Sequence, residues 1–255
     1  MKNTQPLVIQ GPKTPANPSG LQVLSLDEVS GMPLGQFYEF AGRIVNVDNA
    51  NYYDSAVVIA GTAYTQSQKK VLFTKGKSEA DATVNTAAAI AEKGEFLTNM
   101  ITGGEFEGGT TFLMEQIAVD ISLTSEIPTT YGSRGQIVAP NYTASTTVSA
   151  ANNLKAYTEQ IELQFLRNED IKHRGLLRFF PSPFGFSGAF GSPNSGFVQN
   201  GYGIPTWNNL ARVRVLASKD RFSAVLQPVV ETWTPSMTAI IRVCLLGKVI
   251  KSMAV

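Results

Sequence analysis

Residues 106–119 read Phe106-Glu-Gly-Gly-Thr-Thr-Phe-Leu-Met-Glu-Gln-Ile-Ala-Val119: an aromatic residue, a turn and then an apolar strand. Residues 233–246 read Trp233-Thr-Pro-Ser-Met-Thr-Ala-Ile-Ile-Arg-Val-Cys-Leu-Leu246 and repeat that order of features. Thr111 aligns with Thr238, an offset of 127 residues in a chain of 255. Few residues are identical, so the match is one of pattern. An offset of half the chain predicts two similar all-β halves and favours structural assembly over catalysis.

Strand-like segments surround these two stretches. The segment from Phe112 to Leu123 ends in residues whose side chains strictly alternate between two faces. Ile117, Val119 and Ile121 lie on one face and Asp120 on the other. A period of two is typical of a half-buried antiparallel strand. By the same criteria and by content of β-branched and aromatic residues, we expect further strands over residues 21–26, 36–47, 55–61, 70–74, 161–165, 176–180, 211–216, 222–226 and 239–250.

One segment predicts a helix. Residues 79–93 are rich in alanine, Ser78 is a suitable N-cap, and Gly94 follows as a C-terminal glycine. We therefore expect one short Ala-rich helix in the first half of the chain.

The chain divides into an arm and two expected sandwiches. Four prolines and few apolar residues predict an extended N-terminal arm over residues 1–20. The first sandwich is expected over residues 21–130 and the second over residues 131–255, with a boundary in polar sequence near residues 126–135.

A long loop is the main candidate for contacts with partners. Residues 181–205 are rich in glycine, proline and aromatic residues, and loops of this length are usually functional. The rings could order by packing on a neighbouring subunit or ligand, or the loop could pack on itself. The subunit-contact candidates are Phe184, Phe186, Phe190, Phe197, Tyr202 and Trp207.

The sequence lacks the combinations of residues that most catalytic and metal sites need. Cys244 is the single cysteine and His173 the single histidine, which disfavours a metal site, a cupin-type centre and a Ser-His-Asp triad. We expect Cys244 to be a buried core residue and His173 a surface residue in a charged loop. Residues 48–54 place Asp and Asn oxygens close together in an expected loop, but their spacing matches no known calcium loop. We expect no enzyme activity, no cofactor and no metal.

The charge and the targeting motifs of the sequence bear on its expected partners and place of synthesis. Only 16% of residues are charged, which suits a subunit whose surface is covered by neighbours, and the net charge is +1 with no long basic run. We therefore expect no direct sequence-specific binding of nucleic acid. Residues 1–10 show no signal-peptide pattern, and no apolar run reaches membrane-spanning length. We expect synthesis in a host cytoplasm.

Two groups of motifs resemble viral jelly-roll capsid proteins. The first is Thr98-Asn-Met100 with Gly104–Phe112 and the alternating strand after it. The second is Phe222-Ser-Ala-Val-Leu-Gln-Pro228, leading through Thr234-Pro-Ser-Met237 into the last strand. Over most of its length the chain is similar to double jelly-roll major capsid proteins of small icosahedral bacteriophages with an internal membrane.

The resemblance implies a structural virion protein built from two tandem jelly-roll sandwiches. It implies homotrimers of pseudo-hexagonal outline that tile an icosahedral shell and contact neighbouring capsomers and other capsid proteins. The arm over residues 1–20 would then reach a neighbour or an underlying viral membrane. A vertex or spike protein of the same particle stays open, as does a β-sandwich lectin-like module that stacks sugars on Trp207 and Tyr202.

Overall fold

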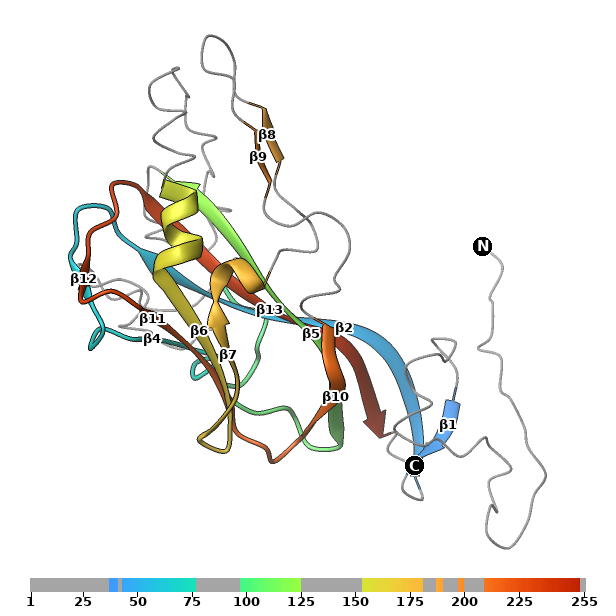
Figure 1. Ribbon diagram of the computed structural model, residues 1–255. Coiled ribbons are helices and arrows are strands. Elements are labelled where there is room, and N and C mark those ends of the chain that lie inside the picture. The colour runs from blue at the N-terminus through green and yellow to red at the C-terminus, as the bar shows by residue number, and fades with distance from the viewer. Residues whose placement is uncertain are drawn as a thin grey trace, which may run out of the picture.

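The computed structural model describes residues 37–40, 43–76, 97–124, 153–180, 187–189, 197–199 and 209–252, and most of these residues lie in β-strands. Two principal sheets face each other (Figure 1). The larger sheet contains, in spatial order, β1 (Phe37–Phe40), β2 (Arg43–Val58), β13 (Thr238–Ser252), β5 (Thr110–Thr124) and β10 (Asn209–Ala217). The smaller sheet contains β4 (Lys70–Leu72), β11 (Phe222–Pro228), β6 (Ile161–Arg167) and β7 (Asp170–Leu176). The protein is therefore an all-β sandwich.

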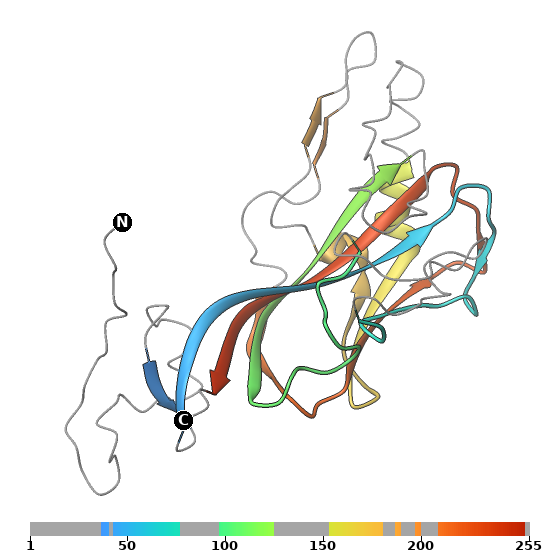
Figure 2. The same ribbon diagram turned by 180° about the vertical axis from the view of Figure 1, so that it is seen from behind.

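Short elements complete the described part of the chain. β3 (Tyr64–Thr65) pairs with β12 (Thr232–Trp233), and β8 (Ser187–Ala189) pairs with β9 (Phe197–Gln199). A helix over residues 153–160 leads into β6, and the 3₁₀ turn η2 (Leu177–Phe179) follows β7. Seen from behind, β2 curves away from the sandwich toward β1 (Figure 2).

The strand order of the two sheets is that of a jelly roll. Eight of the described strands, taken along the chain, are β2, β4, β5, β6, β7, β10, β11 and β13. Numbered one to eight in that order, the strands of the larger sheet are 1, 8, 3 and 6 (β2, β13, β5 and β10). The strands of the smaller sheet are 2, 7, 4 and 5 (β4, β11, β6 and β7). All pairings are antiparallel. Two facing sheets of four strands in this order form one complete jelly roll.

The described strands form one sandwich, where the sequence analysis expected two in tandem. β13, from the expected second sandwich, lies between β2 and β5 of the expected first, and β11 pairs with β4. The expected boundary itself lies outside the described residues. The similar residues 106–119 and 233–246 lead into β5 and β13, which are adjacent central strands that pair along most of their length. Both strands meet the same environment, so they show the same pattern of side chains.

One apolar core joins both sheets and both halves of the chain. Ile117, Val119 and Ile121 of β5 lie in this core, as their alternation predicted. The ring of Phe222 lies 4.9 Å from Phe106, 5.7 Å from Phe73 and 6.3 Å from Phe165 between ring centroids. Stacked and tilted rings at these distances fill the space between the sheets with apolar contacts.

Most sequence expectations within the described residues are confirmed. The segments 112–123, 161–165, 211–216, 222–226 and 239–250 are strands, and Cys244 is buried. Other expectations about local structure were wrong. Residues 48–54, expected in a loop, lie within strand β2. The strand expected over residues 176–180 is absent, because β7 ends at Leu176 and residues 177–179 form the 3₁₀ turn η2. The arm over residues 1–20 and the helix over residues 79–93 lie outside the described residues.

Candidate functional site

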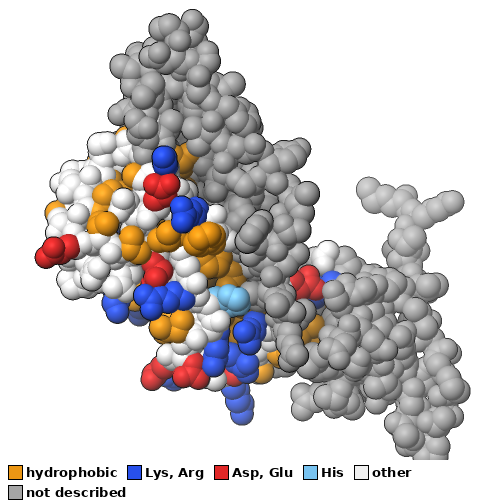
Figure 3. Space-filling model, in the orientation of Figure 1, with side chains coloured by type: hydrophobic (Ala, Val, Ile, Leu, Met, Phe, Trp, Pro, Cys, Tyr) orange, Lys and Arg blue, Asp and Glu red, His pale blue; other side chains and the backbone are white. Residues whose placement is uncertain are grey.

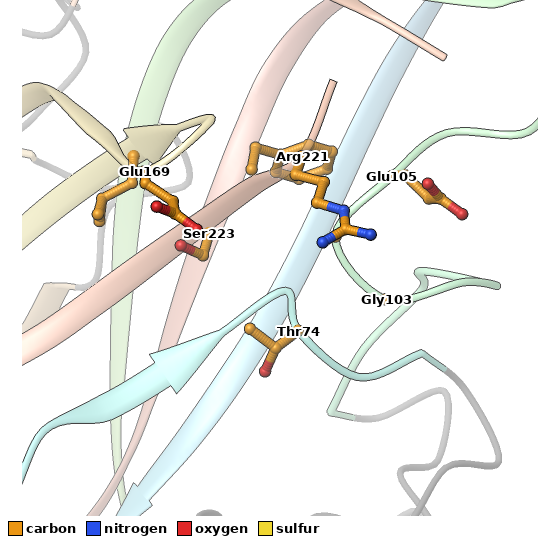
Figure 4. A pocket seen from close by; sticks show the side chains of 9 residues that line it. Thr74, Gly103, Glu105, Glu169, Arg221 and Ser223 are labelled. Atoms are coloured by element: carbon orange, nitrogen blue, oxygen red, sulfur yellow. The ribbon is translucent and has the colours of Figure 1, made fainter. Parts of the chain in front are cut away.

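A pocket of about 420 Å³ opens where several turns meet at one end of the sandwich (Figure 4). This loop-end pocket is lined by Thr74, Gly103, Gly104, Glu105, Leu166, Glu169, Arg221, Phe222 and Ser223. Its walls come from the segment after β4, the segment before β5, the β6–β7 turn and the start of β11. Strands of the smaller sheet, together with loops that include the segment leading into β5 of the larger sheet, therefore line one pocket.

Hydrogen bonds tie these turns to one another. The Asn168 N–H donates to the Arg221 carbonyl at 2.8 Å, and the Arg221 N–H donates to Asn168 Oδ1 at 3.0 Å. The Phe222 N–H donates to the Gly104 carbonyl at 2.9 Å. The β6–β7 turn, the β10–β11 turn and the segment before β5 are thus fixed against one another, so the shape of the pocket is set before a ligand arrives.

The backbone around the loop-end pocket is unusually constrained. Glu169 has φ of 71° and Asn168 has φ of 50°, in the left-handed region that costs a side-chain-bearing residue about 1–2 kcal/mol. A Cβ atom on Gly103 would lie 2.2 Å from the Thr74 carbonyl oxygen, so only glycine fits there. Strained residues of this kind often gather at binding sites.

The polar groups of the loop-end pocket could bind a polar ligand. In the view of Figure 4 the Arg221 side chain extends between Glu169 and Glu105, with Thr74 below it. Arg221 forms no ion pair with another described residue, so its guanidinium is available to a ligand. Ser223 has no hydrogen-bonded base among the described side chains, and a nucleophile needs one.

A second cavity lies between the sheets at the side where β7 and β10 form their edges. This basic pocket measures about 140 Å³ and is lined by Phe165, Arg167, Lys172, Arg214 and Leu216. Phe165 and Leu216 are buried. A bulge between β6 and β7 interrupts their register next to Phe165, where Lys172 lies. Three cationic side chains from three strands therefore meet over an apolar floor.

His173 lies beside this basic pocket. The sequence predicted a surface residue in a charged loop, but His173 lies in β7 opposite Phe165 and is half-buried. Burial, and then the positive charge of Arg214, lower the pKa of His173 below its usual value. Figure 3 shows the His side chain next to a group of Lys and Arg side chains on this face. The lowered pKa favours the neutral form of the imidazole.

Of the six predicted contact residues, only Phe197 lies within the described residues. Phe184, Phe186, Phe190, Tyr202 and Trp207 lie outside the described residues. Phe197 lies in β9, where its backbone is opposite Ala189. The aromatic cluster predicted from these residues remains a prediction.

Other candidates in the sequence serve the fold. Trp233 packs on the core in an edge-on contact with Tyr157, 4.8 Å between ring centroids. Asp54 is fully buried and accepts hydrogen bonds from the backbone N–H groups of Phe73 at 2.6 Å and Ser55 at 2.9 Å. Within the described ranges no three His, Cys, Asp or Glu side chains are grouped as metal ligands. No helix in those ranges is long and apolar enough to cross a membrane.

Comparison of the chain with protein-family models, curated proteins and solved structures found no match. The sequence analysis missed both pockets. Their charged residues, including Arg221, Glu169 and Arg214, come from turns and strands that are distant in the chain and follow no fixed spacing. Only the pairing of the strands brings them together.

Proposed function

We propose that this chain is a structural subunit of an icosahedral virion shell that assembles by contacts between copies of itself. The observation that carries the proposal is the complete jelly-roll order of β2, β13, β5 and β10 facing β4, β11, β6 and β7. Capsid subunits are one of the main groups of proteins built on this architecture, together with lectin domains and cupins. A fold alone does not define a function, so the other groups have to be weighed.

The composition of the core disfavours the cupin group. Cupin-type centres hold a metal with several histidines inside the sandwich, whereas this chain has one histidine. The space between the sheets is occupied by Phe and aliphatic side chains. A charged fraction of only 16% further suits a subunit whose surface is covered in an assembly.

The described strands form one sandwich, and this changes the shell geometry that the sequence suggested. A trimer with a pseudo-hexagonal outline needs two sandwiches in each chain. Because the described residues of a chain form one jelly roll, we propose that each chain occupies one position in the shell. Six copies, and not three, would then surround a hexagonal position. The arm over residues 1–20 and the segment 181–205 remain our candidates for contacts with neighbouring subunits, other virion proteins or an underlying membrane. The place of function would be the virion, after synthesis in the host cytoplasm.

A lectin-like module is the second candidate, because the loop-end pocket offers groups that bind sugars. Glu105, Glu169 and Arg221 could hydrogen-bond the hydroxyl groups of a saccharide, and the pocket is fixed in shape by the bonds between its turns. A spike or vertex protein of the same particle would combine this pocket with the shell proposal.

Light scattering coupled to size-exclusion chromatography tests the proposal. The mass of the purified chain is measured over a range of concentrations, with and without residues 1–20. The shell proposal predicts regular oligomers or particles well above the 27.5 kDa of one chain. A monomer at every concentration, together with saccharide binding on a glycan array that Arg221→Gln abolishes, would instead support the lectin-like module.

A further inference from the structure

The basic pocket carries more positive charge than its neighbours neutralise. Arg167 pairs with Asp220 at 2.7 Å, and Lys172 pairs with Asp170 at 3.0 Å. Asp170 is 76% exposed, so the second pair is solvated and weak. Arg214 has no ion-pair partner among the described residues. The pocket therefore retains an uncompensated positive charge.

Two buried polar atoms at this place have no hydrogen-bond partner among the described residues. They are Nε of Arg167, whose side chain lines the pocket, and Nε2 of His173 beside it. Most buried polar atoms in folded proteins have a hydrogen-bond partner, and a bound ion or water is one explanation for an atom that lacks one. Arg167, which lines the pocket, therefore keeps a hydrogen-bond donor that its ion pair with Asp220 does not use.

The arrangement of the donors indicates the shape of a group that the pocket would bind. Arg167 projects from β6, Lys172 from β7 and Arg214 from β10, so donors reach the cavity from three strands and from both sheets. A planar carboxylate is well served by one guanidinium, whereas a tetrahedral oxyanion presents oxygens in several directions. The cavity of about 140 Å³ is much larger than a single water molecule requires.

We propose that the basic pocket formed by Arg167, Lys172 and Arg214 binds a phosphate group. This inference goes beyond the shell proposal and does not rest on it. The apolar floor of Phe165 and Leu216 lowers the local dielectric constant and strengthens the contacts of the cations with the phosphate. The phosphate could be free or belong to a nucleic-acid backbone, in which case the contact would carry no sequence information.

Isothermal titration of the full chain with inorganic phosphate, at constant ionic strength, tests the site. The test variants are Arg214→Gln, at an exposed position, and Lys172→Gln, whose ion pair is solvated. The matched control is Arg174→Gln, which also removes one positive charge. Arg174 lies in β7, as Lys172 does, is 63% exposed and pairs with Glu162 at 2.8 Å. We expect Arg214→Gln to weaken phosphate binding by about tenfold or more and Arg174→Gln to leave it nearly unchanged.

Three results would overturn the proposal. The first is no phosphate binding by the wild-type chain at millimolar concentration. The second is equal weakening by Arg174→Gln and Arg214→Gln, which would indicate only a general effect of charge. The third is acetate competing as well as phosphate, which would indicate a carboxylate site.

A second titration separates the two sources of phosphate. The probe is a short single-stranded oligonucleotide without a terminal phosphate, competed with inorganic phosphate. Binding that phosphate displaces and that Arg214→Gln weakens supports the site with a nucleic-acid backbone as its source. Phosphate binding without oligonucleotide binding supports the site with free phosphate or a small phosphorylated molecule as its source.

Discussion

The rings of Phe106 and Phe222 are stacked, with centroids 4.9 Å apart and an angle of 27° between their planes. Phe106 precedes β5 of the larger sheet, and Phe222 begins β11 of the smaller sheet. The contact joins the two sheets, and it also joins the two halves of the chain. The jelly roll should therefore fold and unfold as one unit.

Replacing Phe222 tests whether the two halves of the chain unfold together. Phe222 is 3% exposed and contacts three other rings, so Phe222→Ala should lower the free energy of unfolding by about 3–5 kcal/mol. Urea unfolding followed by tryptophan fluorescence and by circular dichroism should give coincident transitions. The control is Phe179→Ala, at a ring that is 48% exposed, which should have little effect. Two separate transitions in the wild-type chain would show that the halves are independent.

Asp220 should make stability depend on pH in the acidic range. Burial alone would raise its pKa, but hydrogen bonds from the Ala217 N–H, Asn168 and Arg167, with the charge of Arg167, lower the pKa of Asp220 below its usual value. Because the folded-state pKa is lower than the unfolded one, the carboxylate stabilises the fold above about pH 4. This contribution is lost as the pH falls through the folded-state pKa.

Asp220→Asn should therefore be less stable than the wild type at pH 7, and the difference should shrink as the pH falls below about 4. Urea midpoints measured across this range check the prediction. Asp170→Asn is the control, because Asp170 is 76% exposed and its ion pair contributes little. A stability difference that stays constant down to the lowest pH would contradict the assigned role of the carboxylate.

Glu169 should tolerate glycine better than most positions do. Its φ of 71° is strained for a residue with a side chain, so Glu169→Gly should raise the free energy of unfolding by about 0.5–1 kcal/mol. Thermal unfolding measures the change. The adjacent control Asp170→Gly lies in the extended strand β7 and should be destabilising. A loss of stability in Glu169→Gly would show that the Glu169 side chain contributes contacts that outweigh the strain.

Cys244 should be chemically inert in the folded protein. The side chain lies in β13 and is 2% exposed, and burial raises the pKa of the thiol to about 12. Because the thiolate is the reactive form, labelling with a thiol reagent should be very slow until urea unfolds the chain. An added thiol at the exposed position Ser67, in the variant Ser67→Cys, should react at once. Rapid labelling of the native wild type would contradict the packing around β13.

The sequence predicted the individual strands better than their partners. Alternation in residues 117–121 and the apolar run in residues 239–250 reflect local demands of a half-buried sheet, and both became strands. Pairing depends on contacts between distant residues. The similarity of residues 106–119 to residues 233–246 therefore could not distinguish two related domains from two adjacent strands of one sheet.

The pockets were harder still to predict. Glu169 takes its left-handed conformation in a turn that is fixed by bonds to Arg221, and Arg214 meets Lys172 only because the two sheets face each other. Neither arrangement follows a local spacing. Residue counts do not depend on strand pairing, and one histidine and one cysteine limit metal and triad chemistry in any fold.

Electron microscopy of the purified full-length chain, concentrated in steps under several salt conditions, tests the central claim most directly. A jelly-roll shell subunit should form closed, hollow particles of uniform diameter, with a surface lattice in which one sandwich occupies each position. A field that contains only separate single chains at the highest concentration and under every salt condition would contradict the proposed function.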